Sequence, residues 1–202
     1  MIRIENTQVY DFTAAIRGMR NPLNSWDKSD TREGNYIGVN DMELMQKLTL
    51  AGNDHSKFLR MMGVSCDMVA PLYWWKEFDT YKVGVVRNSC STMHTIHKRP
   101  LTLEDFSTDH LFNSSKVALL GVIETINQCR DFYKDTSDKD YWWQIIQLLP
   151  SSYNQRATVM LNYMVLRNMY HARKNHKLDC WRYFCKWIET LPYAKELICN
   201  VD

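Results

Sequence analysis

The sequence predicts an α+β protein in which helices pack on a small mixed or antiparallel sheet. Short runs that alternate apolar and polar residues predict strands, at 1–10, 64–70 and 157–161. Elsewhere apolar residues recur at helical spacing, most clearly in a helix that begins at Ser114 or Ser115 and ends near Tyr133. Neither an internal repeat nor a linker divides the 202 residues, so we expect a single domain, 1–202.

Three short helices are predicted in the first part of the chain. The first covers 14–20 and follows residues that can cap it, and the polar stretch at 21–40 then predicts a mobile loop. Asp41 is expected to cap the second helix, which Gly52 stops. The third is a short helical stretch that carries Phe58.

Helices also dominate the rest of the chain. Pro71 ends the strand at 64–70 and is expected in the first turn of the next helix. Residues 81–93 show no clear period and are interpreted as a loop. The remaining helical segments have helical spacing or an end signal such as Pro150, and are predicted at 103–106, 138–148, 165–170 and 178–188.

The charge balance argues against nucleic acid as a partner. Lys and Arg total 25 and Asp and Glu total 23, which gives a net charge of +2, whereas binding driven by counterion release needs a larger basic excess. No apolar run is long enough to span a bilayer, and the first residues lack the charged-then-apolar order of a signal peptide. We therefore expect a cytoplasmic protein without a membrane partner.

Neither a metal site nor a catalytic nucleophile is predicted. His94 and His97 have the spacing of two ligands, but no third ligand accompanies them. Cys180 and Cys185 are five residues apart, which directs them to different faces of a helix, so packed thiols are preferred. Cys90 lies near Arg87, but without a placed base a small residue in a tight loop is the preferred interpretation.

Three polar stretches interleaved with aromatic residues predict a ligand site, at 52–57, 76–94 and 156–173. Each stretch alone is typical of a solvated face. Together, their cations, amides and aromatic rings suit an anionic planar ligand, because Arg and Lys neutralise phosphate, Asn and Ser bind ring edges, and aromatic rings stack. The expected ligand is a nucleotide or a flavin.

The order of these pieces resembles that of the flavin-dependent thymidylate synthases over most of the chain. The pieces that carry the resemblance are the Ala-Arg helix at 14–20, the turn at 51–58, Ala70-Pro71, Leu149-Pro150, Asn162, Asn168, Arg173 and Trp181. The most specific match is the spacing from Asn162 to Asn168 to Arg173.

The family signature R-H-R-x-x-S-x-N-E-x-S-x-R-Y is present in altered form. Thr80-Tyr81-Lys82 takes the place of Arg-His-Arg, and one residue is inserted before Asn88. Lys76-Glu77 takes the place of a preceding Arg-Gln. Two family arginines are replaced by Met93 and Ile146, and Arg87 and Lys76 are candidates to restore the lost charge.

The resemblance implies an enzyme that uses FAD to methylate dUMP to dTMP, with methylenetetrahydrofolate and NADPH as co-substrates and without a protein nucleophile. The implied dUMP-binding residues are Ser91, Arg173, Glu77 and Arg87. The implied FAD-binding residues are His55, Tyr81, Lys82, Asn88, Asn162 and Asn168. A homotetramer is also implied, and the tryptophans support it because one small core does not readily hide residues 74, 75, 142 and 143.

The replaced arginines leave two alternatives open. The same scaffold would perform another one-carbon transfer to a pyrimidine nucleotide, or would bind a nucleotide without turnover. Outside the enzymes, the chain would be an interaction protein with basic patches at 98–99 and 167–177, although the net charge of +2 argues against this.

Overall fold

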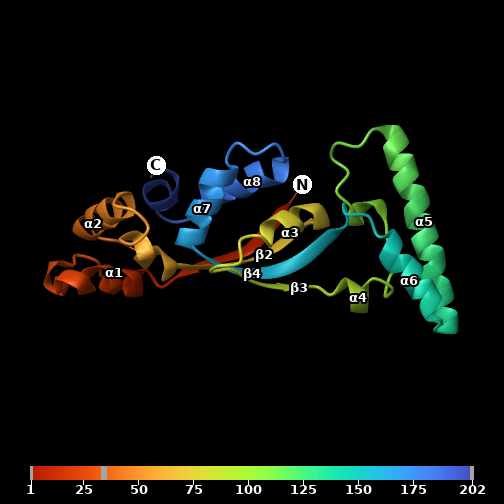
Figure 1. The fold of residues 1–202 in the computed structure, drawn as a ribbon, viewed down its shortest axis with the longest axis horizontal. Helices are drawn as coiled ribbons and strands as arrows, with labels where there is room; N and C mark the ends of the chain where they lie inside the picture. The colour runs from red at the N-terminus through yellow and green to blue at the C-terminus, as the bar shows by residue number, and fades with distance from the viewer. Residues whose placement is uncertain (1, 33–35, 201–202) are drawn as a thin grey trace. The chain divides into compact units, whose positions relative to one another are not determined.

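The computed structural model describes residues 2–32 and 36–200, and it confirms the predicted α+β fold. Four strands form one antiparallel sheet in the order β1-β2-β4-β3 (Figure 1). The strands are β1 (Arg3–Tyr10), β2 (Gly63–Pro71), β3 (Val86–Ser89) and β4 (Asn154–Asn162). The α-helices are α1 (Phe12–Arg20), α2 (Val39–Leu50), α3 (Leu72–Phe78), α4 (Thr92–Thr95), α5 (Asn113–Thr136), α6 (Lys139–Leu148), α7 (Tyr163–Arg173) and α8 (Asp179–Ile188).

Contacts between residues divide the chain into two compact units. Unit 1 consists of Met1–Arg3, Met68–Thr80 and Asn88–Ala157. Unit 2 consists of Ile4–Asp67, Tyr81–Arg87 and Thr158–Asp202. Each unit therefore contains residues from all four strands, and the expectation of a single domain over 1–202 stays a prediction.

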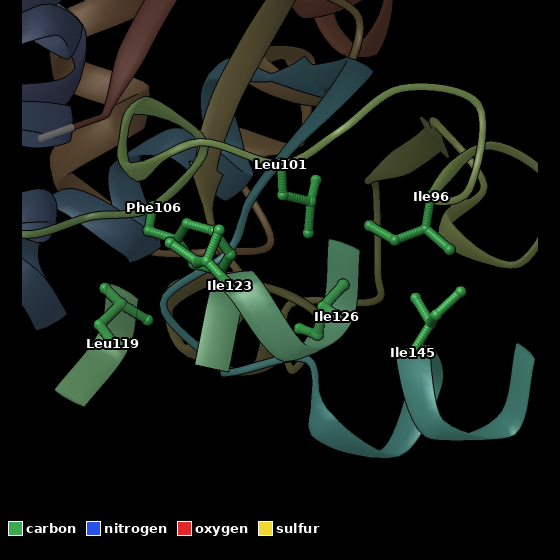
Figure 2. Close-up of a cluster of buried hydrophobic side chains, with 7 residues drawn as sticks. All are labelled: Ile96, Leu101, Phe106, Leu119, Ile123, Ile126 and Ile145. Carbon is green, nitrogen blue, oxygen red and sulfur yellow. The ribbon is translucent and has the colours of Figure 1, made fainter. Parts of the chain in front are cut away.

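The core of unit 1 lies between the long helix α5, helix α6 and the segment that follows β3. Its buried apolar side chains are Ile96, Leu101, Phe106, Leu119, Ile123, Ile126 and Ile145, and Figure 2 shows them pointing toward one another from these elements. Helices α5 and α6 pack side by side; α5 ends at Thr136, and the next residue, Ser137, turns the chain with a left-handed φ of 59°. The Asp138 side chain then caps α6 by accepting a hydrogen bond from the Asp140 amide at 3.0 Å.

One side chain of α5 binds the backbone of the neighbouring segment. The Asn127 Nδ2 donates to the Leu101 carbonyl at 2.9 Å, and the Leu101 amide donates to the Asn127 Oδ1 at 2.8 Å. Both polar backbone groups of a buried residue are thus satisfied without a strand partner, as buried backbone groups require.

The core of unit 2 packs α7 against α8, the C-terminal segment and the short helix at Ser56–Arg60. Trp181, Phe184, Tyr163, Leu166 and Leu59 are all essentially inaccessible to solvent there. Helix α8 contributes Trp181 and Phe184 because its buried positions, which also include Cys180, Cys185 and Ile188, follow helical spacing.

A buried ion pair joins α1 to α2 in unit 2. The Arg20 Nε donates to the Asp41 Oδ1 at 2.6 Å, and Arg20 and Asp41 are 4% and 0% exposed. Asp41 also accepts from the Ser29 hydroxyl at 2.7 Å and from the Thr31 amide at 3.0 Å. The sequence predicted that Asp41 caps α2, and this prediction is wrong. The helix begins two residues earlier, at Val39, and the Asp41 carboxylate binds Arg20 instead.

Several element predictions need correction. Residues 81–93 were expected to be a loop, but β3 forms within them. The loop predicted at 21–40 contains two 3-10 turns, Asn21–Leu23 and Trp26–Lys28, and its residues 33–35 lie outside the described part of the chain. A π-helical turn at Lys195–Cys199 was not predicted. The other predicted strands and helices are present, with ends shifted by a few residues.

The helices were also compared with the requirements of a membrane span. Along residues 2–32 and 36–200, no helix is both long enough and apolar enough to cross a bilayer.

Candidate nucleotide site

In unit 2 the end of α7 holds Arg173 against two aromatic side chains. The Arg173 Nε donates a hydrogen bond to the Tyr81 hydroxyl at 2.9 Å. The guanidinium carbon lies 4.8 Å from the Trp181 ring centroid and 5.6 Å from the Tyr81 ring centroid, within the range of cation–π attraction. The two rings meet edge to face at 5.9 Å. These contacts fix the orientation of a planar cationic group at the surface of unit 2.

At the other end of α7, Asn162 is a helix cap. Its Oδ1 accepts from the Val165 amide at 3.0 Å, while its Nδ2 lies 3.5 Å from the Gly84 carbonyl. Gly84 has a φ of +79°, and a Cβ there would lie 2.6 Å from the Asn162 Nδ2. A glycine at position 84, between Lys82 and β3, therefore allows the signature segment to approach the start of α7 this closely.

The other predicted residues of unit 2 present polar groups to solvent. His55, Lys82 and Asn168 are exposed, and Arg87 is half-buried on β3. His55 occupies the cap position of the short helix at Ser56–Arg60, and its amide donates to the Gly52 carbonyl. Of the predicted residues, the structure brings Tyr81 to Arg173, and Asn162 to the segment that follows Lys82.

Three predicted residues belong to unit 1. Glu77 is half-buried and lines a cavity of about 710 Å³ together with Lys76, Leu149 and Ser151. Asn88 is exposed on β3, and Ser91 is exposed at the cap position of α4. The Lys76-Glu77 pair and the Leu-Pro segment, far apart in the sequence, thus line one cavity.

The two positions where a family arginine is missing serve other purposes. Ile146 is half-buried and packs against the core of unit 1. Met93 is 49% exposed, and its carbonyl lies 3.4 Å from the Trp142 indole nitrogen, which donates to it. An arginine at 146 would lose this apolar packing, so the substitution is consistent with the surrounding structure.

Burial makes two of the thiols less acidic than a free cysteine. Burial raises the pKa of Cys66 to about 12, and burial with the nearby Glu189 raises the pKa of Cys185 to about 12. Cys90 is exposed, with its Sγ 3.6 Å from the Thr95 hydroxyl. Within the described part of the chain, no group of three His, Cys, Asp or Glu side chains is placed to bind a metal ion.

Sequence reasoning missed two features of unit 2. Trp181 was noted only as part of a Trp-bearing helix, yet it supplies the ring closest to Arg173. Arg20 and Asp41 gave no signal as a pair because they are 21 residues apart on different helices.

Comparisons with known proteins agree with the fold. No family profile and no curated protein sequence matches the chain. The structure resembles that of thymidylate synthase X (ThyX) from Helicobacter pylori, crystallised with FAD and dUMP, with a TM-score of 0.74 and 17% identity, over 100% of this chain and 99% of that one. A second crystal structure of the same enzyme with FAD and dUMP gives the same TM-score and identity, over 98% of this chain and 99% of that one.

A third similar structure is the UMP/dUMP methylase PolB from Streptomyces cacaoi, bound with 5-Br dUMP. Its TM-score is 0.64 and its identity 10%, over 99% of this chain and 95% of that one. At such identities the likeness establishes the fold, which is that of the flavin-dependent thymidylate synthases. The resemblance stated from the sequence is thus confirmed for the fold.

Proposed function

We propose that this protein is a flavin-dependent enzyme that methylates dUMP to dTMP. The overall reaction consumes dUMP, methylenetetrahydrofolate, NADPH and a proton, and it yields dTMP, tetrahydrofolate and NADP⁺. The observation that carries the proposal is the oriented Arg173 guanidinium, at the residue where the resemblance expects a dUMP-binding arginine. ThyX from Helicobacter pylori, which has this fold, binds FAD and dUMP.

The donor set of unit 2 fits two anionic ligands. Arg173 offers a planar cation suited to phosphate, and Lys82 adds an exposed ammonium group. Asn168 presents an exposed amide, and Asn162 retains its Nδ2 after its Oδ1 caps α7. Bound FAD would supply the reducing and carbon-relaying chemistry, while these side chains would bind its polar groups and exclude water.

We assign the remaining roles in the same way. Ser91, Glu77 and Arg87 would bind dUMP with Arg173, and His55, Tyr81 and Asn88 would contribute to the FAD site. We also propose that the functional unit is a cytoplasmic homotetramer, the assembly that the family resemblance implies.

The test is to identify the small molecules that the purified protein carries and then to assay turnover. We expect yellow protein that releases FAD on denaturation and forms dTMP only when dUMP, methylenetetrahydrofolate and NADPH are all present. Arg173→Ala is the matched control and should keep FAD while losing dUMP-dependent turnover. Colourless protein that does not bind added FAD would contradict the proposal and favour an interaction protein.

A second candidate is methylation of UMP, or another one-carbon transfer to a pyrimidine nucleotide. The fold match to the UMP/dUMP methylase and the replacement of two family arginines by Met93 and Ile146 favour it. Assays with UMP and dUMP in competition separate the two, since the substrates differ only in the 2′-hydroxyl group. A product formed only from UMP would replace the first proposal with the second.

A further inference from the structure

Unit 1 contains a cavity that none of the predicted dUMP- or FAD-binding residues lines. Its volume is about 700 Å³, within the range typical of small-molecule sites. Strands contribute Arg3, Val69 and residues 154–156, Tyr153 lies directly before β4, and the segment after β3 contributes further lining residues, including Cys90 and Thr92. Cys90 and Thr92 alternate with the signature positions Ser89 and Ser91, which do not line it.

One wall of the cavity is rigid. Arg99 and Asp105 form a bidentate ion pair, and Asp105 also accepts from the Thr102 amide at 2.8 Å in a capping box. Although burial alone would raise the pKa of Asp105, hydrogen bonds from Arg99 and Thr102 lower it overall, so the carboxylate stays charged. Arg99 is therefore neutralised within the wall.

The rim as a whole is basic. Including the Arg99 and Asp105 pair, the cavity is lined by four cationic side chains, Arg3, Lys98, Arg99 and Arg156, and by the two carboxylates of Glu104 and Asp105. All four cations are exposed. An anionic group of the ligand would thus be favoured over a cationic one.

Part of the cavity wall is apolar. Ile96, Leu101 and Phe106 line it and belong to the core cluster shown in Figure 2, and Tyr153 packs edge to face on Phe106 at 5.8 Å. An apolar and aromatic wall of this kind suits the ring of a small planar ligand.

We propose that this cavity is a second small-molecule site, which binds a nucleoside monophosphate independently of the Arg173 site. Its phosphate would contact the rim formed by Arg3, Lys98 and Arg156. Its ring would lie against the apolar wall beside Tyr153.

Cys90 provides a reporter for this cavity, because it lines the cavity and is the exposed one of the six cysteines. The full-length protein is alkylated with iodoacetamide, with and without dUMP, UMP or AMP, and Cys90 modification is followed by peptide mass spectrometry. At least one nucleotide should slow it about tenfold near saturation. Inorganic phosphate and the corresponding nucleoside should slow it less, since each provides only part of the contacts.

Two charge reversals locate the effect. Lys98→Glu should lower the affinity for the protecting nucleotide by about tenfold or more, the range expected for a lost charge-assisted contact. Lys134→Glu, which makes the same change at an exposed position in the last turn of α5, should leave protection intact. Arg173→Ala should also leave it intact, which separates this inference from the proposed function.

Four results would overturn the inference. They are no protection by any of the nucleotides, equal protection by phosphate (an adventitious ion only), protection that survives Lys98→Glu, and resistance of Cys90 to alkylation in the ligand-free protein, which would mean that the cavity is closed.

Discussion

At the scale of single residues, Arg173 is the side chain whose surroundings best define a role. The Tyr81 hydroxyl and the Trp181 ring restrict its guanidinium, so less conformational entropy is lost when it binds phosphate. We predict that Arg173→Ala raises the KM for dUMP about 30-fold, or about 2 kcal/mol. Arg167→Ala, on the same helix, should change it less than about fivefold. Equal small effects at both positions would remove Arg173 from the site.

Arg87 tests whether a new cation replaces a lost one. It stands directly before Asn88, where one residue is inserted in the signature, while Met93 and Ile146 occupy the places of family arginines. We predict that Arg87→Ala weakens dUMP binding about tenfold and leaves the FAD content unchanged. The intact protein should turn over slowly, since a shift of about 1 Å in a bound substrate can cost ~10²-fold in rate. Full activity that Arg87→Ala does not affect would contradict both statements.

Asn162 has a visible structural role and a proposed ligand role, and two substitutions separate them. Asn162→Ala removes the cap of α7 and should lower the free energy of unfolding by about 1 kcal/mol. Asn162→Ser keeps a capping oxygen and should restore most of that stability. If the Asn162 amide binds FAD, both variants lose FAD affinity in spectroscopic titrations. Normal affinity in the Ser variant would leave only the cap.

At the scale of elements, the connection between α1 and α2 depends on one buried ion pair. Asp41→Asn leaves the Arg20 charge buried without a counter-ion, and we expect a loss of ~3–5 kcal/mol in urea unfolding. Asp27→Asn, which changes an exposed carboxylate nearby, should stay within about 0.5 kcal/mol.

The same ion pair makes the free energy of unfolding depend on pH, and the sign of this dependence follows from the pKa of Asp41. Burial by itself would raise the pKa of Asp41, but hydrogen bonds from Thr31, Ser29 and Arg20 outweigh it and hold the pKa below its ordinary value of 3.8. The folded protein therefore binds this proton less readily than the unfolded chain. Its contribution to stability is present above pH 3.8 and is lost as the pH falls toward the folded value. Equal acid sensitivity in the Asp41→Asn variant would contradict this.

The elements also show what the sequence can and cannot reveal. Strand β4 was predictable because Ala157, Val159 and Leu161 are buried in alternation with exposed residues. The strand β3 was not, because Val86–Ser89 has no apolar pattern and is defined by pairing with a distant strand. Next to it the Cys90 amide donates to the Arg156 carbonyl, and the Gln155 side chain donates to the Cys90 carbonyl.

The candidate site follows the same division. The spacing of Asn162, Asn168 and Arg173 identified a helix and its polar residues, since spacing is a local property. The contacts of Arg173 with Tyr81 and Trp181 could not be predicted in this way. They depend on how α8 and the signature segment pack on α7. Such long-range contacts leave no trace in periodicity.

At the scale of the whole molecule, only some of the tryptophans first considered for the proposed tetramer are available to a partner, and Trp143 is the exposed one, at 48%. Trp74 and Trp75 are 0% and 1% exposed within unit 1, so they offer nothing to a partner. Exposed apolar side chains also follow the start of α5, with Val117 at 68% and Leu120 at 47%. Apolar surface of this kind often marks contacts between subunits.

We predict that the protein scatters light as a tetramer at micromolar concentration. Leu120→Glu should shift it to smaller species, because a charge would be buried in the interface. Thr125→Glu, at an exposed position on another face of α5, should not. A single 24 kDa species in the unmodified protein would refute the tetramer.

Because Asn127 binds both backbone groups of Leu101, hydrogen exchange at the Leu101 amide reports the local separation of α5 from this segment. The Leu101 N–H is bonded to a side chain of α5 rather than to a strand, so deuterium enters there only when the helix leaves the segment that follows β3. Its exchange rate therefore measures the free energy of undocking α5 separately from unfolding of the sheet. In Asn127→Ala the Leu101 amide proton should exchange at the rate of an unprotected amide, whereas the amide protons of the sheet should keep their slow exchange rates.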